Sequence, residues 1–298
     1  MQEDLDVLAI VTPTYNRAEL LPKLYDSLLN QTDFSFRWYI IDDGSTDNTE
    51  AVCKSFLSDQ FDILYLKKEN GGKHTALNFS YKFIQEDVTI IVDSDDYLAC
   101  DAVETICKDW EKYKSCDDVG GMSYYKLLFT GQVIGDTFHQ NYYISSYIQY
   151  IINEKIRGDK AEVFRSSVLK ENPFPVFENE KFLSEAVIWI KMSLKYKMIY
   201  IQKGIYYCEY LQDGLTMSGR RKLVKNPLGY VEHAKAYLSD GIKQAIQYKY
   251  TLMYIAASMF AKIPFKTMYR QCKRKCKFIV CLPFGMLLYV YWKLRYDH

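Results

Sequence analysis

The first hundred residues alternate short apolar runs, rich in β-branched residues, with segments of helical periodicity. The runs predict strands at 7–12, 38–41, 63–66 and 88–92, and the segments between them predict helices at 18–29, 49–57 and 75–84. Strands that are apolar on both faces and separated by helices indicate a parallel sheet with right-handed crossovers. The sequence therefore predicts an α/β fold, whose ligand would bind beyond the carboxyl ends of the strands.

After residue 100 the pattern is less regular. It predicts strands at 119–125, 160–164 and 198–201, a hairpin turn at Thr130-Gly131 and a helix at 182–194. From about residue 220 the sequence pattern predicts helices, and no internal repeat or long linker precedes this point. We therefore expect a body of residues 1–219 and a C-terminal helical extension of residues 220–298.

Composition narrows the class of protein. The 298 residues are 49% hydrophobic with only 14 Gly and 7 Pro, which excludes collagen-like and disordered chains. A net charge of +1 argues against a globally basic nucleic-acid binder, so no nucleic-acid partner is expected. The charge is uneven, however: residues 262–298 hold nine Lys/Arg and one Asp, a local balance of +8, which leaves −7 for the first 261 residues. This asymmetry predicts a basic appendage on an acidic body.

The N-terminus and the cysteines bear on localisation. The sequence MQEDLDVLAI has no basic segment before its apolar run, so we expect no secretory signal. Eight Cys without a CxxC pair indicate reduced thiols of a cytoplasmic protein, and a zinc site is not expected.

Polar clusters follow the predicted strands. PTYNR (13–17) follows the first strand, DDGSTD (42–47) the second, NGGKHTALN (70–78) the third and DSDD (93–96) the fourth. Parallel strands end at one edge of a sheet, so these clusters are expected to converge on one crevice.

The DSDD cluster suggests a metal site. Asp93, Asp95 and Asp96 would repel one another unless a cation or tight hydrogen bonding neutralises them. Short oxygen ligands suit Mg²⁺ or Mn²⁺ shared with substrate phosphates. An acidic loop that merely caps the following helix is the structural alternative.

Two further clusters are each compatible with a nucleotide. A carboxylate of Asp42-Asp43-Gly44-Ser45 could accept the imide N–H of uracil, although this sequence is also a common turn. Gly71-Gly72-Lys73 could reach a diphosphate but lacks the spacing of a P-loop, and a Gly-rich turn with a solvated Lys is the alternative.

Taken in order, TPTYNR, IIDDGSTDNT, NGGKHTALN and IIVDSDD resemble a family 2 glycosyltransferase of the GT-A fold. The resemblance is strong over about residues 7–100 and weaker to about 216, where GDKAEVF, KFLSEAVIW and YLQDGLT are similar to the acceptor side of bacterial members that build capsule or surface polysaccharide. It implies a Rossmann-like, mostly parallel sheet flanked by helices, with a nucleotide-sugar half of about 1–100 and an acceptor half of about 101–219.

The resemblance also implies roles for single residues. The donor would be a UDP-sugar, and the cofactor Mn²⁺ or Mg²⁺. Residues expected at the nucleotide are Thr12, Pro13, Tyr15 and Arg17 around the nucleoside, Asp43 at the uracil, Lys73 near the base or diphosphate, and Asp93 with Ser94 at the ribose. Metal contacts are expected from Asp95 and Asp93, and Asp96 is a further candidate for the metal or donor sugar. Arg220 and Arg221 could close over the diphosphate, or could be a solvated basic pair.

Glu185 is the candidate general base. Many relatives carry a Glu-Asp pair here, whereas this chain has Glu185-Ala186, so the role would fall on Glu185 alone. Family members invert the anomeric centre, which implies a β-linked product from an α-linked donor. The structural alternative is an acidic residue that only favours the start of a helix.

The tail combines basic and apolar stretches. Residues 248–263 predict a buried helix, 262–277 carry seven Lys/Arg and no acid, and 278–292 are fifteen uncharged residues that Pro283 and Gly285 are expected to interrupt. This pattern predicts contact with an anionic membrane surface rather than a spanning helix. It suits a peripheral enzyme on the cytoplasmic face of the plasma membrane that extends a polyprenyl-diphosphate-linked glycan. A packed terminal helix pair or a homodimer interface is the alternative.

Two other classes remain open at this point. A nucleotidyltransferase would also hold metal at an acidic strand end, but would need a nucleoside triphosphate and no acceptor-facing base. A non-catalytic glycan-binding or scaffold protein would be marked by loss of the Asp93-Ser94-Asp95 triplet, which is intact. The donor sugar stays open among neutral hexoses, N-acetylhexosamines and uronic acids.

Overall fold

The computed structural model describes residues 7–209, 222 and 224–296, and the chain divides into two compact units. The first contains residues 7–146, 155–173 and 195–209, and the second contains 147–154, 174–194 and the described residues from 222 onward. The boundary expected near residue 220 lies outside the described residues. Segments 147–154 and 174–194, which the sequence pattern groups with the acceptor half, belong to the second unit.

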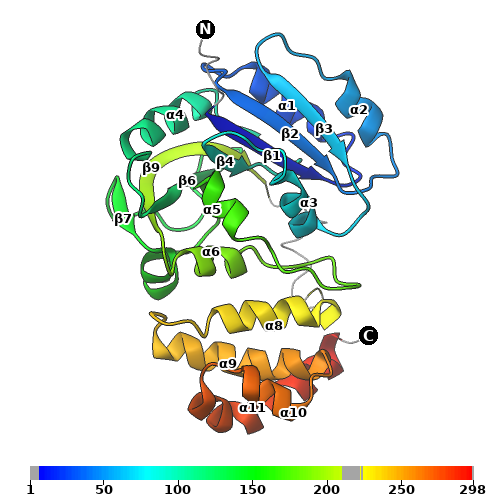
Figure 1. The fold of residues 1–298 in the computed structure, drawn as a ribbon, viewed down its shortest axis with the longest axis vertical. Helices are drawn as coiled ribbons and strands as arrows, with labels where there is room; N and C mark the ends of the chain where they lie inside the picture. Colours follow the sequence, from blue (N-terminus) through cyan, green and yellow to red (C-terminus); the bar gives the residue numbers. More distant parts are fainter. Residues whose placement is uncertain (1–6, 210–221, 223, 297–298) are drawn as a thin grey trace. The chain divides into compact units, whose positions relative to one another are not determined.

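The first unit is built on a nine-stranded sheet (Figure 1). The strands are β1 (Leu8–Thr14), β2 (Phe36–Asp42), β3 (Asp62–Lys67), β4 (Val88–Ile91), β5 (Tyr97–Leu98), β6 (Val119–Leu128), β7 (Tyr143–Ser145), β8 (Lys160–Arg165) and β9 (Lys197–Cys208). Their order is β3-β2-β1-β4-β8-β6-β9-β5, with β7 paired to β9.

Strand direction changes across this sheet. The pairs β1–β2, β2–β3 and β1–β4 are parallel, which confirms the prediction for the first hundred residues. Beyond β4 the sheet is mixed: β8 runs antiparallel to both β4 and β6, while β6 and β9 are parallel. The predicted turn after β6 is also confirmed, because the amide of Gly131 donates to the carbonyl of Leu128.

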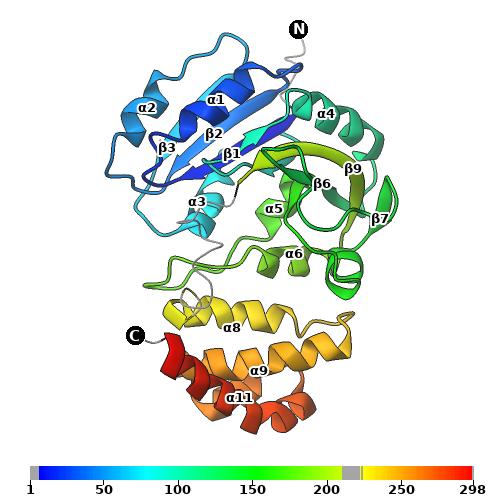
Figure 2. The ribbon, with the colours of Figure 1, turned by 180° about the vertical axis from the view of Figure 1, so that it is seen from behind.

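Helices cover both faces of the sheet. They are α1 (Leu21–Leu29), α2 (Thr49–Ser55), α3 (Lys73–Ser80), α4 (Ala102–Tyr113) and α5 (Ser166–Glu171). Apolar residues of α1, α2 and α4 share one core with alternate residues of β1, β2 and β4, and α1 lies in front of the sheet in Figure 2. The opposite face, seen in Figure 1, carries α3 and α5. Burial on both faces explains why the central strands read as continuous apolar runs.

The second unit is helical. Its elements are a π-helix (Ile148–Asn153), α6 (Ala186–Met192), α8 (Pro227–Ala236), α9 (Gln244–Phe260), α10 (Phe265–Gln271) and α11 (Lys275–Tyr296). Buried residues of α8, α9 and α11 form one core, with Tyr254, Phe278 and Trp292 among its largest members. The predicted helix at 182–194 begins later, at Ala186.

The expectation that Pro283 and Gly285 interrupt the apolar tail is wrong. Helix α11 runs unbroken through both residues for 22 residues. Close packing on α9 offsets the backbone hydrogen bond that Pro283 cannot donate, because Gly285 lets the two helices approach. A Cβ at Gly285 would lie 2.7 Å from the Cβ of Ile255 on α9.

Candidate active site

The polar clusters meet at one edge of the first unit's sheet. The register pairs Thr14 with Asp42 and Asp42 with Lys67, so β1, β2 and β3 end side by side. Strand β4, which leads into the DSDD loop, pairs with β1 on the other side. The structure therefore brings together the loops that follow these four strands.

The loops after β1 and β2 are joined by hydrogen bonds. The Asn16 amide donates to Ser45 Oγ at 2.9 Å, and Asn16 Oδ1 accepts from the Thr46 amide at 2.8 Å. The Asp43 amide donates to the Thr14 carbonyl at 2.8 Å. These contacts fix one loop against the other.

The four residues expected around the nucleoside differ in exposure. The Thr12 hydroxyl is fully buried and accepts a hydrogen bond from Trp38 Nε1 at 2.9 Å, and Pro13 is buried too. Tyr15 is 47% exposed and Arg17 is partly exposed. Side-chain contact with a ligand is therefore open to Tyr15 and Arg17, whereas Thr12 offers only its backbone.

Asp43 is a buried carboxylate with three donors. Its oxygens accept from the amides of Gly71 at 3.0 Å and Gly72 at 2.6 Å, and from Lys68 Nζ at 2.6 Å. The Gly-rich loop after β3 is thus wrapped around the carboxylate that follows β2. Lys68 was not a sequence candidate, since a Lys at a strand end is common and carries no specific signal.

Asp42 and Gly44 shape the turn itself. Asp42 accepts from the Tyr65 hydroxyl at 2.6 Å and from the Ser45 amide at 2.7 Å, so it is committed to the scaffold. Gly44 has φ of 81°, and a Cβ there would lie 2.8 Å from the Asn70 amide nitrogen. Glycine is needed both for this backbone conformation and for the close approach.

The DSDD loop is held from two sides. Lys73, the first residue of α3, forms an ion pair with Asp93 at 2.6 Å. Tyr206 of β9 donates its hydroxyl hydrogen to Asp96 at 2.7 Å and accepts from the Asp93 amide at 3.0 Å. Tyr206 was missed from sequence because it lies 110 residues from Asp96 and adjoins it only through the return of β9.

Burial and charge move the carboxyl groups of this loop in opposite directions. Burial alone would raise the pKa of Asp93, but the cations Lys73, Lys126 and Arg17 bring it below its ordinary value. For Asp96 burial prevails, and the pKa rises to about 7 although Lys126 and the hydrogen bond from Tyr206 oppose the rise. The loop thus combines a carboxyl group whose pKa is lowered with a neighbouring one whose pKa is raised.

Lys126 is a second basic residue that the sequence did not indicate. It projects from β6, and its Nζ lies 4.0 Å from the centre of the Tyr206 ring. Burial would lower its pKa, yet Asp93 and Asp96 raise it, so the side chain is charged.

The oxygen ligands of this loop suit a divalent cation shared with a substrate. Within the described residues no three His, Cys, Asp or Glu side chains already converge as a metal cage. Asp93 is engaged by Lys73 and Asp96 by Tyr206, whereas the partly exposed Asp95 has no hydrogen bond or ion pair to any described residue. Mg²⁺ and Mn²⁺ commonly take one or two protein carboxylates and complete their shell with phosphates and water. The residues fit that arrangement rather than a closed site.

Glu185 belongs to the second unit. It is partly buried and immediately precedes α6, where its carbonyl accepts from the amides of Ile188 and Trp189. The Trp189 ring is buried edge-on against Phe174, at 6.2 Å between centres, which is a core role. Arg220 and Arg221 lie outside the described residues.

A second acidic residue anchors the segment that carries Glu185. The buried carboxylate of Glu180 accepts from the amides of Leu228 at 2.8 Å and Gly229 at 2.7 Å, at the start of α8. Asn226 Oδ1 accepts from the amides of Lys181 and Phe182. Within the second unit, residues 180–182 are therefore bonded to the first turn of α8, a contact with no local sequence signal.

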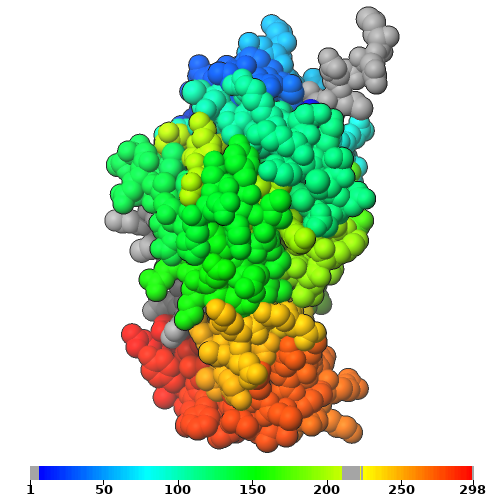
Figure 3. All heavy atoms as spheres, turned by 90° about the vertical axis from the view of Figure 1, so that its left-hand side faces the viewer, coloured from blue at the N-terminus to red at the C-terminus, as the bar shows by residue number. Residues whose placement is uncertain are grey.

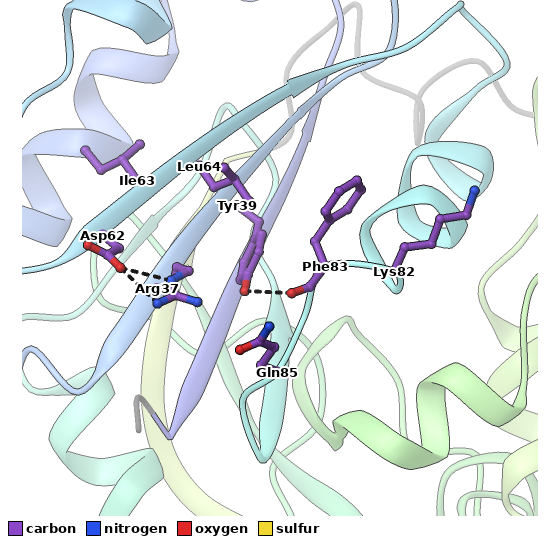
Figure 4. A pocket seen from close by; sticks show the side chains of 8 residues that line it. All are labelled: Arg37, Tyr39, Asp62, Ile63, Leu64, Lys82, Phe83 and Gln85. Atoms are coloured by element: carbon purple, nitrogen blue, oxygen red, sulfur yellow. Dashed lines mark hydrogen bonds and ion pairs between the residues drawn. The ribbon is translucent and has the colours of Figure 1, made fainter. Parts of the chain in front are cut away.

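A pocket elsewhere on the first unit is not a good candidate site (Figure 4). It includes Arg37 and Asp62, near the amino ends of β2 and β3, the edge opposite to the one where such sheets bind ligands. Asp62 at 2.9 Å and Glu86 at 3.4 Å neutralise the Arg37 guanidinium. We interpret this cluster as structural.

A sheet of this kind, with polar side chains gathered where the parallel strands end, is typical of nucleotide-binding proteins. The model of glycosyl transferase family 2 matches residues 9–170, more than half of the chain, and the protein belongs to this family.

Curated relatives agree with this assignment. The chain is 27% identical over 283 residues, covering 88% of this chain and 86% of the relative, to the GalNAc(5)-diNAcBac-PP-undecaprenol beta-1,3-glucosyltransferase of Campylobacter jejuni. It is 25% identical over 215 residues, 67% of its length, to glycosyltransferase GlyA of Streptococcus pneumoniae. The chain spans only 30% of the length of GlyA.

Solved structures share the fold. A TarS fragment from S. aureus, crystallised in complex with UDP-GlcNAc, superposes with a TM-score of 0.63 at 16% identity, covering 94% of this chain and 80% of that one. The mannosyltransferase PcManGT from Pyrobaculum calidifontis, in complex with GDP-Man and Mn²⁺, gives 0.57 at 15% identity, covering 97% and 87%. The GT-A fold expected from the sequence is confirmed.

Proposed function

We propose that this enzyme transfers a sugar from a UDP-sugar to a hydroxyl group of a glycan acceptor, with inversion at the anomeric carbon. The observation that carries the proposal is the joined set of strand-end loops, in which Asp43 is enclosed by the Gly-rich loop and Asp93 is paired with Lys73. The UDP-GlcNAc complex of TarS, which shares the fold, supports the choice of donor.

The nucleotide would lie along these loops. Tyr15 and Arg17 present side chains to the nucleoside, while Thr12 and Pro13 line its site through the backbone. Asp43 retains lone-pair capacity for the uracil imide beside its three present donors. At the ribose and diphosphate, the residues involved are Lys73, Asp93 and Ser94.

A divalent cation would be held by Asp95 together with Asp93, and Asp96 would face the cation or the donor sugar. The Asp95 carboxylate, which has no hydrogen-bond or ion-pair partner among the described residues, and the Mn²⁺ complex of PcManGT support this assignment. Bound there, Mn²⁺ or Mg²⁺ would offset the negative charge that the leaving diphosphate acquires. Arg220 and Arg221 would add positive charge at the same diphosphate.

Glu185 would act as the general base. In a single displacement, the acceptor oxygen bonds to C1 of the donor sugar, the bond from C1 to the diphosphate oxygen breaks, and the hydroxyl proton passes to the Glu185 carboxylate. The neighbouring residue is Ala186, so no adjacent carboxylate can take over this role.

Calorimetric titration with UDP, GDP, CDP and UTP, with and without Mn²⁺, tests the donor assignment. We expect binding that is selective for UDP and strengthened by Mn²⁺, and we expect Asp95→Asn to abolish the Mn²⁺ dependence. A preference for UTP would favour nucleotidyl transfer instead. Absence of nucleotide binding would favour a scaffold role, and an unaltered Mn²⁺ effect in Asp95→Asn would remove that residue from the metal site.

The acceptor and the membrane concern the second unit. The C. jejuni relative is named for an undecaprenol-linked acceptor, and we infer a polyprenyl-diphosphate-linked glycan here, as in capsule or surface polysaccharide synthesis. Helix α11 is long and apolar enough, by length and composition, to cross a membrane. However, its residues Phe278, Cys281 and Trp292 are buried in the core with α9, which favours a helix lying on the bilayer surface.

The other face of α11 is apolar and exposed. Phe284 is 62% and Leu287 66% exposed, and the face continues in helical spacing through Val280, Tyr291 and Leu294. In Figure 3 the orange-red and red atoms of α11 lie at the surface of the second unit. Lys275 and Lys277 at one end, with Lys293 and Arg295 at the other, complement an anionic leaflet. The enzyme would thus be peripheral on the cytoplasmic face of the plasma membrane.

Sedimentation with vesicles tests this contact. We expect the protein to bind phosphatidylglycerol-containing vesicles but not neutral ones, and Phe284→Glu/Leu287→Glu to release it. Leu57→Glu, at a 78% exposed apolar position of the first unit, is the matched control and should still bind. Wild-type protein that stays in solution would contradict membrane contact. Concentration-dependent association lost in the double variant would identify a homodimer interface instead.

A further inference from the structure

Lys126 is held in an unusual setting on β6. Its ammonium lies against the face of the Tyr206 ring, and it makes no hydrogen bond or ion pair with any described residue. The same ring carries the hydroxyl that binds both Asp93 and Asp96. A half-buried cation is thus kept beside the acidic loop by a ring rather than by a carboxylate.

The charges around the loop explain why a fixed cation matters. Three carboxylates, Asp93, Asp95 and Asp96, stand within four residues, and Lys73 is already committed to Asp93. Lys126 interacts electrostatically with both Asp93 and Asp96. It therefore offsets negative charge that would otherwise repel a diphosphate and attract a free cation.

Taking the proposed donor site as given, we propose that Lys126 is a positioning residue that makes the nucleotide diphosphate bind first and the divalent cation second. Its charge repels a divalent cation that arrives alone and attracts the diphosphate oxygens. The cation therefore binds well only when the diphosphate accompanies it. Lys126 thereby sets the order of assembly without touching the reacting atoms.

The experiment measures the affinity for Mn²⁺ and the affinity for UDP separately, with the full chain. Lys126→Met keeps the aliphatic stem against Tyr206 but removes the charge. We expect it to bind Mn²⁺ alone about tenfold more tightly and UDP in EDTA about tenfold more weakly, as for one unit charge in a partly hydrated site. Lys126→Arg should retain both wild-type affinities.

Lys112→Met is the matched control, because Lys112 also lies by a tyrosine ring, 4.8 Å from the centre of Tyr142, and pairs with Asp109 away from the strand ends. It should leave both affinities unchanged.

A merely structural Lys126 would change neither affinity or weaken both, and either result overturns the inference. Lys126→Gln provides a second uncharged variant if the Met variant unfolds. Wild-type protein that binds neither UDP nor Mn²⁺ overturns the proposed function as well, whereas normal wild-type binding with unaltered variants overturns this inference alone.

Discussion

Both compact units have an apolar core, but they differ in how their other segments are held together. In the first, buried carboxylates bind backbone amides, within a turn as Asp42 does with Ser45 and between loops as Asp43 does with Gly71 and Gly72. In the second, Glu180 makes one such contact at the start of α8, but the helices α8, α9 and α11 pack on one another through apolar and aromatic side chains such as Tyr254 and Trp292. Directional bonds hold loops at fixed distances, whereas apolar packing is non-directional. The first unit therefore suits recognition of a polar ligand, and the second suits contact with apolar surroundings.

The largest expected effect comes from replacing Glu185. It runs against the contrast between the units, because it gives the helical second unit a catalytic role. Glu185→Gln should lower kcat by about 10²- to 10⁴-fold, since the amide cannot accept the acceptor's proton. Binding of UDP with Mn²⁺ should be unchanged, because Glu185 is not among the residues proposed to hold the donor. Transfer assays with a UDP-sugar and calorimetry measure the two separately.

Glu178→Gln is the control for that change. Glu178 is an exposed acid of the same segment and should be dispensable. Normal turnover of Glu185→Gln would exclude it as the base, and weakened UDP binding would point to a donor contact instead.

The next effect concerns the directional bonds of the first unit. Asp43→Ala should lower the free energy of unfolding by about 3 kcal/mol, because it leaves the Lys68 charge and two amides without their buried acceptor. Urea unfolding measures the loss. Asp62→Ala removes the exposed partner of Arg37 and should cost little. Equal losses in the two variants would show that Asp43 is no more important to stability than a surface ion pair.

The sequence predicts the first unit's central strands well for a physical reason. Burial on both faces requires continuous apolar runs, as in β1 and β2, and polar residues then mark the points where the strands end. The Asp43 and Asp93 positions are visible in this way, before any tertiary contact is known. The fold class follows from the same local pattern.

Contacts made by returning strands and crossing segments are not visible in the same way. Tyr206 reaches the acidic loop because β9 pairs with β5, the strand that follows this loop, and Lys126 reaches it because β6 pairs with β9 in turn. Glu180 is bonded to the start of α8 across nearly fifty residues. The prediction for Pro283 failed because the cost of proline, a missing backbone hydrogen bond, can be read from the local sequence. The packing of α11 on α9 that offsets this cost involves residues distant in sequence.

The smallest expected effect is a pH dependence of stability that comes from the packing of the second unit. His233 of α8 lies among the rings of Tyr230, Tyr237 and Tyr250, and its Nδ1 is buried without a partner among the described residues. Burial, with a smaller contribution from Lys249, lowers its pKa to about 4. Below about pH 6.5 the unfolded chain gains a proton at this residue that the folded chain does not, so stability falls as the pH falls.

At pH 5 this loss should reach about 2 kcal/mol relative to neutral pH. His233→Phe keeps an aromatic ring in place and should remove that part of the pH dependence, as measured by urea unfolding of the full chain at neutral pH and at pH 5. Asp96 acts in the opposite sense, because its raised pKa favours the folded state on the acidic side. Since Asp96 is the same in both proteins, its contribution cancels in the difference between wild type and variant. If the wild type and His233→Phe show the same pH dependence of stability, His233 is solvated in the folded protein. The second unit would then be less tightly packed around its aromatic rings than the first unit is around its carboxylates.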